Sequence, residues 1–308
     1  MIALRARAAR ALGSGLVFAL FVMMLTVPST VSACASCGCG DPTLTAVGVE
    51  QPYKNRLRLV LEERVGTRTS GADVMRERLV MTRTQLGIAY TPHARITLAA
   101  FMPLIASTLT GPTGASQHIV GIGELELQAR VLVARDRSFA PRHLFWLVAG
   151  LKTPTTPRIH DDAGFPYPDD DQPGSGSWDP LGGATYAWFG GFVSVYSSFL
   201  FRIPTDGERG YRRGRSILSA SAVQLQPLPR LAIQLGANLH YLTADALSNG
   251  APAPNTGGFV AAIAPGLLIN PWRDLLLRVA VEVPVYQSMN GVQSLGPQGV
   301  LAISYDIL

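Results

Sequence analysis

Three cysteines near the N-terminus are the most reactive side chains of this sequence. Cys34, Cys37 and Cys39 are the only cysteines of the chain, and they lie within the stretch VSACASCGCGDP. Three thiolates at this spacing suit a soft metal such as Cu(I) or Zn(II), with the fourth ligand missing or borrowed from elsewhere. Covalent haem is excluded, because the CxxC pair is followed by Gly38 and not by histidine.

Two other uses of these cysteines remain open. Residues 31–33 before Cys34 resemble a lipidation box, in which Cys34 would be acylated and Cys37 could pair with Cys39. The thiols could also form disulfides with a second chain or with a periplasmic partner such as a redox protein. We rank a soft metal or redox contact first, lipidation second and disulfide chemistry third.

A second chemical candidate is the aspartate-rich segment 153–180, TPTTPRIHDDAGFPYPDDDQPGSGSWDP. Its carboxylates could gather a hard cation such as calcium, or the segment could fold over a pore mouth as a constriction. The ligand spacing of an EF-hand is absent, so the plainer interpretation is a solvated acidic loop. The candidate cation ligands are Asp161, Asp162, Asp169, Asp170 and Asp171.

The N-terminus decides the compartment in which this chemistry would take place. Residues 1–33 carry three arginines and no acid, then an apolar run from Leu16 to Val27, and they end in small residues at Ala33. This order is typical of a cleaved secretory signal. The apolar run is much shorter than the roughly 20 residues of a membrane-spanning helix. We therefore expect an exported protein that is not an α-helical membrane protein.

Charge excludes one class of partner. The whole chain has a formal net charge of +5, and removal of the three signal arginines lowers it to +2. Such a small excess does not support binding to nucleic acid.

The hydrophobic pattern of the mature chain has a period of two. In residues 121–134, GIGELELQARVLVA, apolar residues occupy the odd positions from Leu125 to Val133, and polar residues occupy the even positions from Glu124 to Arg130. The stretches RLAIQLGANLHY and DLLLRVAVEVPVY alternate in the same way. On a β-strand the two sets lie on opposite faces, and no stretch sustains a helical period.

We predict about 12 strands from this pattern. They cover about 54–66, 77–91, 95–107, 117–134, 142–153, 182–189, 191–203, 213–227, 230–243, 256–270, 273–288 and 296–308. Several are long enough to cross a bilayer at a tilt, and short connections alternate with longer ones near 67–76, 108–116, 154–181, 204–212, 244–255 and 289–295.

These features predict an all-β fold, an antiparallel up-and-down transmembrane β-barrel of about 12 strands in the bacterial outer membrane. The barrel would span residues 54–308, after a periplasmic cysteine-containing segment at 34–53. An even strand number places both ends of the barrel on the periplasmic side. The alternative is a secreted soluble β-sandwich or barrel, which would have shorter strands and no regular alternation of loop length.

Several stretches resemble a known family. They are CGCGDPTLT just after the signal, WDPLGGATYAW, RIPTDGERGYRRG, QLGANLHYL and the closing VPVYQSMNGVQSLGPQGVLAISYDIL. Together they are similar to the bacterial outer-membrane barrels grouped as transporter-like proteins of the phenol-degradation meta-pathway family. The resemblance covers nearly the whole mature chain. It implies a barrel that passes small or hydrophobic molecules.

If the apolar faces meet lipid, the polar faces line the lumen. The lumen-lining candidates are Arg58, Arg83, Glu124, Glu126, Arg130, Asn238, His240, Arg278 and Glu282. A barrel of eight strands is filled by its own side chains, and a barrel of 16 to 18 strands leaves an aqueous channel. We therefore expect a narrow or partly occluded path in a barrel of about 12 strands.

We expect a channel or porin-like transporter for a small solute. Paired wall charges that plug the lumen are the alternative, and they would make a non-conducting barrel that anchors an envelope partner. Barrels that hydrolyse lipid use a serine and a histidine that face the lipid. His240 alternates with the apolar residues of its strand and would face the lumen, so we expect no enzyme.

Overall fold

The computed structural model describes residues 54–138, 140–161, 163–169, 171–272 and 274–307, with every side chain but that of Val74. Its strands are β1 (Arg56–Ser70), β2 (Glu77–His93), β3 (Ile96–Thr110), β4 (Ser116–Ile122), β5 (Glu126–Arg135), β6 (His143–Lys152), β7 (Asp179–Phe189), β8 (Val193–Arg202), β9 (Ser216–Leu228), β10 (Leu231–Leu242), β11 (Gly258–Trp272), β12 (Leu275–Met289), β13 (Gln293–Leu295) and β14 (Gln298–Ile307). Two single 3-10 turns, η2 (Asp73–Met75) and η3 (Glu208–Gly210), complete the inventory. No helix in this part of the chain has the length and apolar character needed to span a membrane. The predicted signal 1–33 and cysteine segment 34–53 lie outside the described residues.

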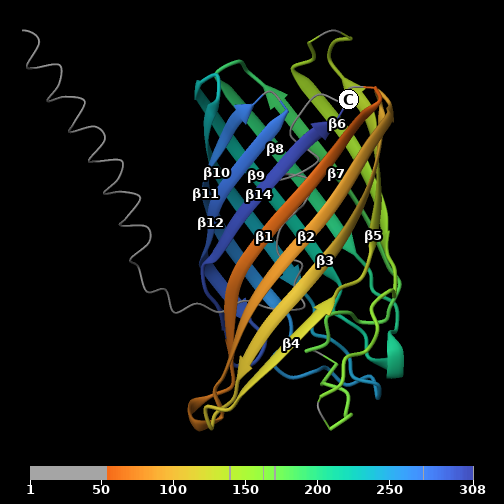
Figure 1. Ribbon diagram of the computed structural model, residues 1–308, viewed down its shortest axis with the longest axis vertical. Coiled ribbons are helices and arrows are strands. Elements are labelled where there is room, and N and C mark those ends of the chain that lie inside the picture. The colour runs from red at the N-terminus through yellow and green to blue at the C-terminus, as the bar shows by residue number, and fades with distance from the viewer. Residues whose placement is uncertain (1–53, 139, 162, 170, 273, 308) are drawn as a thin grey trace, which may run out of the picture. The chain divides into compact units, whose positions relative to one another are not determined.

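The strands form one closed antiparallel barrel (Figure 1). Apart from β4 and β13, the strands follow one another around the ring in chain order, and β1 closes the ring by pairing with β2 on one side and β14 on the other. The segments β4 and β5 share one position beside β3, and β13 and β14 share one position beside β1. The barrel therefore has the 12 strand positions that the sequence predicts.

One predicted strand, 117–134, is interrupted. Ile122 of β4 pairs with Leu104, and Glu126 of β5 pairs with Phe101, so 123–125 forms an irregular step opposite 102–103. The partner strand carries Pro103 here, which has no N–H to give to the ladder. Its carbonyl still accepts the Gly123 N–H at 2.7 Å. A pattern of alternating residues does not reveal such an extra residue, because the step changes the pairing and leaves the chain extended.

The two faces of the barrel wall have opposite character. In β1, Leu59 and Leu61 are 42% and 40% exposed, whereas Arg58 and Glu62 are 7% and 3% exposed. Large apolar side chains are exposed in the same way on strands all around the wall, among them Leu86, Leu127, Leu147, Ile233, Val279 and Leu301. A soluble barrel or sandwich would bury these residues and expose the charges. The exterior is therefore built to meet lipid, as in a barrel of the bacterial outer membrane.

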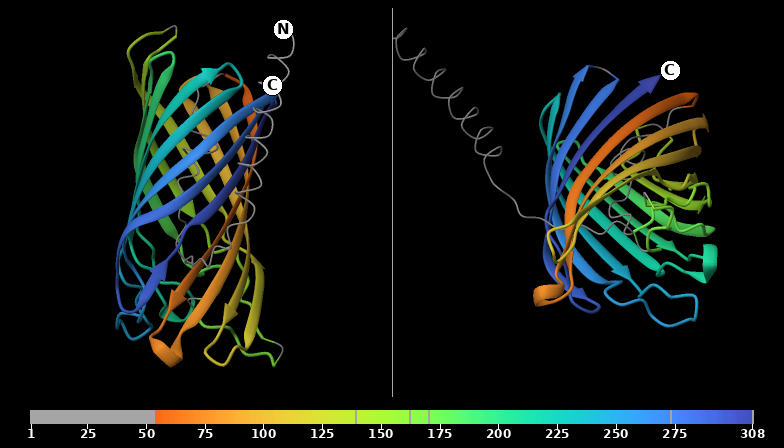
Figure 2. Two further views of the ribbon diagram at one scale, coloured as in Figure 1. Left: turned by 90° about the vertical axis from the view of Figure 1, so that its left-hand side faces the viewer. Right: turned by 60° about the horizontal axis from the view of Figure 1, so that its bottom comes forward.

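The two ends of the barrel differ in their connections. The ends of β1 and β14 meet where Leu57 pairs with Ile307, at the end with the short turns 94–95, 190–192 and 229–230 (Figure 1). The opposite end carries the long loops 153–178, 203–215 and 243–257 (Figure 2). The predicted alternation is confirmed for these three, but the predicted loop 289–295 shrinks to 290–292 because β13 pairs with the end of β1.

Candidate functional site

The closure of the barrel is tied by an ion-pair fork inside the wall. Arg58 Nε and Nη2 donate to Asp306 Oδ1 and Oδ2 at 2.6 and 2.7 Å, and Arg56 contacts the same carboxylate. Arg58 and Asp306 are direct partners in the register of β1 and β14. Two parallel charge-assisted hydrogen bonds of this kind join the first and last strands.

A second group of charges lies further along β1. Arg64 Nε donates to Glu62 Oε1 at 2.6 Å, and Arg64 Nη1 lies 3.6 Å from Glu282 Oε2 on β12. Arg278, also on β12, donates from Nε to Gln234 Oε1 of β10 at 3.0 Å. These pairs join side chains of the wall strands, and the interior also holds another element.

That element is the β6–β7 loop, residues 153–178, which folds into the barrel. Within it, Ser177 is 0% exposed and Gln172 is 5% exposed, values typical of a core and not of a surface loop. A Cβ placed on Gly121 of β4 would lie 2.5 Å from Ile159 and 2.7 Å from Pro173, so the loop packs closely against the wall. The loop therefore narrows the lumen.

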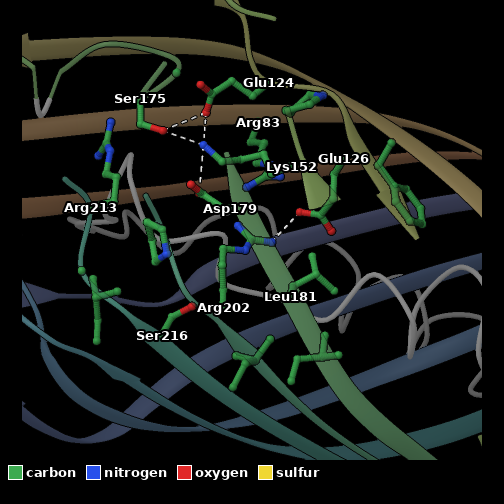
Figure 3. Close-up of a pocket in the computed structure, with 18 of the residues that line it drawn as sticks. Arg83, Glu124, Glu126, Lys152, Ser175, Asp179, Leu181, Arg202, Arg213 and Ser216 are labelled. Carbon is green, nitrogen blue, oxygen red and sulfur yellow. Dashed lines mark hydrogen bonds and ion pairs between the residues drawn. The ribbon is translucent and has the colours of Figure 1, made fainter. Parts of the chain in front are cut away.

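Lys152 joins the loop to the wall (Figure 3). Its Nζ lies 2.9 Å from Asp179 Oδ2, pairs with Glu124 and donates to Ser175 Oγ at 2.6 Å. Glu124 in turn accepts hydrogen bonds from Ser175 Oγ at 3.1 Å and from the Gly176 N–H at 2.6 Å. One ammonium and one carboxylate of the wall thus hold the loop through both its side chains and its backbone.

A cavity of about 130 Å³ lies between this loop and the wall. One part of its lining is charged and includes Arg83, Glu124, Glu126, Lys152, Asp179, Arg202, Arg213, His240 and Asp245. Another part is apolar and includes Phe101, Pro103, Ile105, Leu181, Leu218 and Leu242. The residues come from eight strands and four segments outside them, so only the closed barrel assembles this site (Figure 3).

The lumen candidates from the sequence lie in different surroundings. Arg83, Glu124, Glu126 and His240 line the cavity. Arg58, Arg278 and Glu282 belong to the wall pairs described above, and Asn238 is half-buried on β10. Arg130 is buried, donates to Thr185 Oγ1 at 2.7 Å and lies 5.4 Å above the ring of Trp146. A role in passing solute stays a prediction for each of them.

The described acidic residues of the β6–β7 loop contact neighbouring groups of the same loop. Asp161 Oδ1 accepts the N–H groups of Ala163 and Phe165 at 3.0 and 2.8 Å, and Asp169 pairs with Arg158 at 2.5 Å. The Asp171 N–H donates to the Pro168 carbonyl at 3.0 Å. Asp162 and Asp170 lie outside the described residues.

Metal ligation by the predicted residues stays a prediction. Within 54–307, apart from 139, 162, 170 and 273, no three His, Cys, Asp or Glu side chains gather in a way that could hold a metal ion. Cys34, Cys37 and Cys39 precede that range and lie outside the described residues.

Lys152, Arg202, Arg213 and Asp245 are site residues that the sequence pattern did not single out, and Asp179 was considered only as a carboxylate of the segment 153–180. Lys152 and Arg202 are the last residues of β6 and β8. The inward residues of these two strands are mostly apolar or small, so the pattern of polar residues did not show which face is inward. Arg213 and Asp245 lie in long loops, and Asp179 lies at the β6–β7 junction. The signal that was present is position: each lies at or beyond the loop end of a strand.

Comparison with known proteins places the fold. No family model and no curated protein matches the chain. The structure is similar to an outer membrane channel from Pseudomonas putida F1, with a TM-score of 0.64 and 14% identity over 84% of this chain and 97% of that chain. It is also similar to the β domain of the Bordetella autotransporter BrkA, with a TM-score of 0.50 and 7% identity over 82% of this chain and 100% of that one. A weaker likeness, with a TM-score of 0.45 and 11% identity over 83% and 90%, is to the P. putida toluene transporter TodX. At such identities the first two likenesses show the fold alone, a barrel of the outer membrane.

Proposed function

We propose that this protein is a channel of the outer membrane for small solutes. The observation that carries the proposal is the cavity of about 130 Å³ inside a closed barrel, lined by apolar and charged side chains together. A barrel stabilised only by packing would fill this space with its own side chains, as eight-stranded barrels do. The resemblance of the sequence to transporter-like barrels of the phenol-degradation family supports the same function.

The loop 153–178 makes the path selective. The loop is held by Lys152 and Glu124 and packs against Gly121. A solute that crosses the barrel therefore has to pass the residues that line the cavity. A narrow path of this kind discriminates by size and by the polar groups that line it. We therefore propose a channel for a defined class of small solute and not a general porin.

Conduction in planar bilayers tests the channel. Lys152 and Asp179 are direct partners across β6 and β7, so replacing 155–176 by a short Gly-Ser linker would close a hairpin without disturbing the wall. We expect small conductance steps from the mature protein and larger steps from this variant. The control replaces 111–115, a short loop that is mostly exposed, and should conduct like the parent protein.

The contrary outcome has a definite meaning. If folded parent and loop-deleted barrels both show no steps, the wall pairs around Arg64 and Asp306 close the lumen. The protein would then be a scaffold, for instance one that holds an envelope partner through residues 34–53. An enzyme acting on membrane lipid is the least compatible alternative, because His240 lines the interior cavity.

A further inference from the structure

The carboxylates of the cavity already have donors of their own. Lys152 serves both Glu124 and Asp179, and Arg202 pairs with Glu126. Asp245 accepts the Tyr211 hydroxyl at 2.5 Å and the Gly214 N–H at 2.7 Å. A cationic ligand would have to compete with these donors for every acid of the site.

Two cations of the cavity lack such a partner. Arg83 donates from Nη2 to Gln85 Oε1 at 3.0 Å, but its buried Nε has no acceptor among the described residues. Arg213 donates from Nη2 to the carbonyls of Asp169 and Gln172 at 3.3 and 3.2 Å, and its buried Nη1 is likewise without an acceptor in the described chain. Neither guanidinium lies within 4.0 Å of a described carboxylate.

A guanidinium group that is partly withdrawn from water and has no carboxylate partner is destabilised, since part of its charge has lost water and gained no opposite charge. Both residues line the cavity, and a ligand carboxylate there supplies the missing partner, because its two oxygens match the planar fork of arginine. A neutral solute would offer these guanidinium groups only an uncharged acceptor, which forms a weaker hydrogen bond than a carboxylate does.

The formal charges that line the cavity limit the ligand further. The acids are Glu124, Glu126, Asp179 and Asp245, and the permanent cations are Arg83, Lys152, Arg202 and Arg213. These charges balance, so one added negative charge leaves an excess of one and a dianion leaves an excess of two. Excess charge in a partly enclosed site is unfavourable, so among anions the balance favours a monoanion over a dianion.

The remaining lining describes the body of the ligand. Phe101 and Ile105 of β3 are 2% and 7% exposed, and Leu181 of β7 is 7% exposed. The volume of about 130 Å³ is close to that of an engineered apolar cavity of roughly 150 Å³ that takes up benzene. The space therefore fits one compact apolar group.

We propose that this cavity binds a small organic monoanion, a carboxylate on a compact apolar body of about the size of benzoate. The carboxylate accepts hydrogen bonds from Arg83 and Arg213, and the apolar body packs on Phe101, Ile105 and Leu181. This inference rests on the proposed function in one respect: it names the class of solute that the channel would take.

Calorimetric titration of the mature, detergent-solubilised barrel tests the site with benzoate, benzyl alcohol, acetate and phthalate. Benzoate should bind saturably, and the other three should each bind at least about tenfold more weakly. Benzyl alcohol lacks the charge, acetate lacks the apolar body and phthalate carries a second charge. This comparison needs no variant. Equal affinity for benzyl alcohol, or no binding of benzoate, would overturn the proposal.

Variants then assign the contacts. Arg83→Gln and Arg213→Gln should each weaken benzoate binding about tenfold or more, and the double variant should abolish it. The matched control is Arg278→Gln, an interior arginine whose Nη1 also has no acceptor among the described residues but which lies outside the cavity lining. It should change the affinity by less than about twofold. Wild-type affinity in the double variant would contradict the assignment.

Conductance measured on the same preparations separates this proposal from the channel. If the barrel conducts but does not bind benzoate, the channel proposal stands and the anion site is wrong. If benzoate binds saturably but the barrel does not conduct, the anion site stands and the channel proposal is wrong.

Discussion

At the residue scale, Lys152 connects two buried acids of the interior with the β6–β7 loop. It is 9% exposed and is the cation closest to both Glu124 and Asp179, which are 6% and 2% exposed. Removing one partner from a buried group of charges leaves the others desolvated and uncompensated. The same residue also holds the loop through Ser175 Oγ.

We therefore expect Lys152→Met to lower the free energy of unfolding by about 3–5 kcal/mol. Urea unfolding in lipid vesicles, followed by tryptophan fluorescence, would measure it. Arg137→Gln is the control, since Arg137 is 57% exposed and pairs with Asp136 at 3.5 Å. Breaking an exposed pair costs less than about 1 kcal/mol. A loss as small as this in Lys152→Met would show that water reaches the two acids.

The cysteines are the other prediction at this scale. We expect the mature protein from outer membranes to carry Cys34, Cys37 and Cys39 as three thiols that alkylate only after a chelator has removed one Cu(I) or Zn(II) ion. Intact mass before and after alkylation, with native mass for the metal, would show this. An added diacylglycerol and acyl mass on Cys34 would show that this residue is a lipid anchor, and the three-thiolate site would be wrong.

Residue types alone predicted only part of the site. The alternation of polar and apolar residues placed Glu124 and Glu126 opposite the apolar face of the predicted strand 117–134, and both line the cavity. The alternation could not predict the direction of the Arg213 side chain, because a loop residue belongs to neither face of a strand. The partners of Asp169 and Asp179 were equally hidden, since Arg158 and Lys152 become neighbours only when the loop folds inward.

At the element scale, the inward loop 153–178 depends on glycines at its contacts with the wall. A Cβ on Gly174 would lie 2.6 Å from Thr156 Cβ and 2.9 Å from Glu124 Cγ. Gly176 has a φ of +67°, a backbone region that other residues rarely adopt. The loop can therefore approach the wall only with these small residues in place.

Gly174→Leu should push the loop away from Glu124 and open the path. We expect the single-channel conductance to rise roughly twofold or more, because the narrowest part of the path sets the current. Gly111→Leu is the matched control, since the nearest atom to a Cβ there is the Ala115 carbonyl oxygen at 3.8 Å. Unchanged conductance in Gly174→Leu would mean that the loop does not limit the current.

The strands themselves were the predictable elements. Alternation predicts the period of a strand and its two faces, so 11 of the 12 predicted strands appear as single strands, and only 117–134 appears as two, β4 and β5. The interruption at 123–125 and the pairing of β13 with β1 depend on partner strands. Such partners are far away in sequence, and the pattern of one strand carries no information about them.

At the scale of the whole molecule, the fold is inverted relative to a soluble barrel. Charges such as Glu62 and Arg130 are 3% exposed, while Leu61 and Val279 are 40% and 49% exposed. Sequence alternation shows that two faces exist but does not say which one faces outward. The choice came from strand length and loop length, and the exposed apolar wall is its physical confirmation.

The inversion predicts how the protein responds to charge on its outer surface. Leu61 lies in the middle of β1, paired with Leu86 and Ile303, so in a bilayer its side chain would face hydrocarbon. Leu61→Arg should lower the free energy of unfolding from vesicles by about 2–4 kcal/mol. Val292→Arg is the control, because Val292 is 55% exposed but lies in the loop 290–292 beyond the strands. A soluble protein would tolerate both substitutions, since each places a charge on an exposed site. Equal stabilities for the two variants would therefore place the wall around Leu61 in water, and a large difference in the expected direction would place it in lipid.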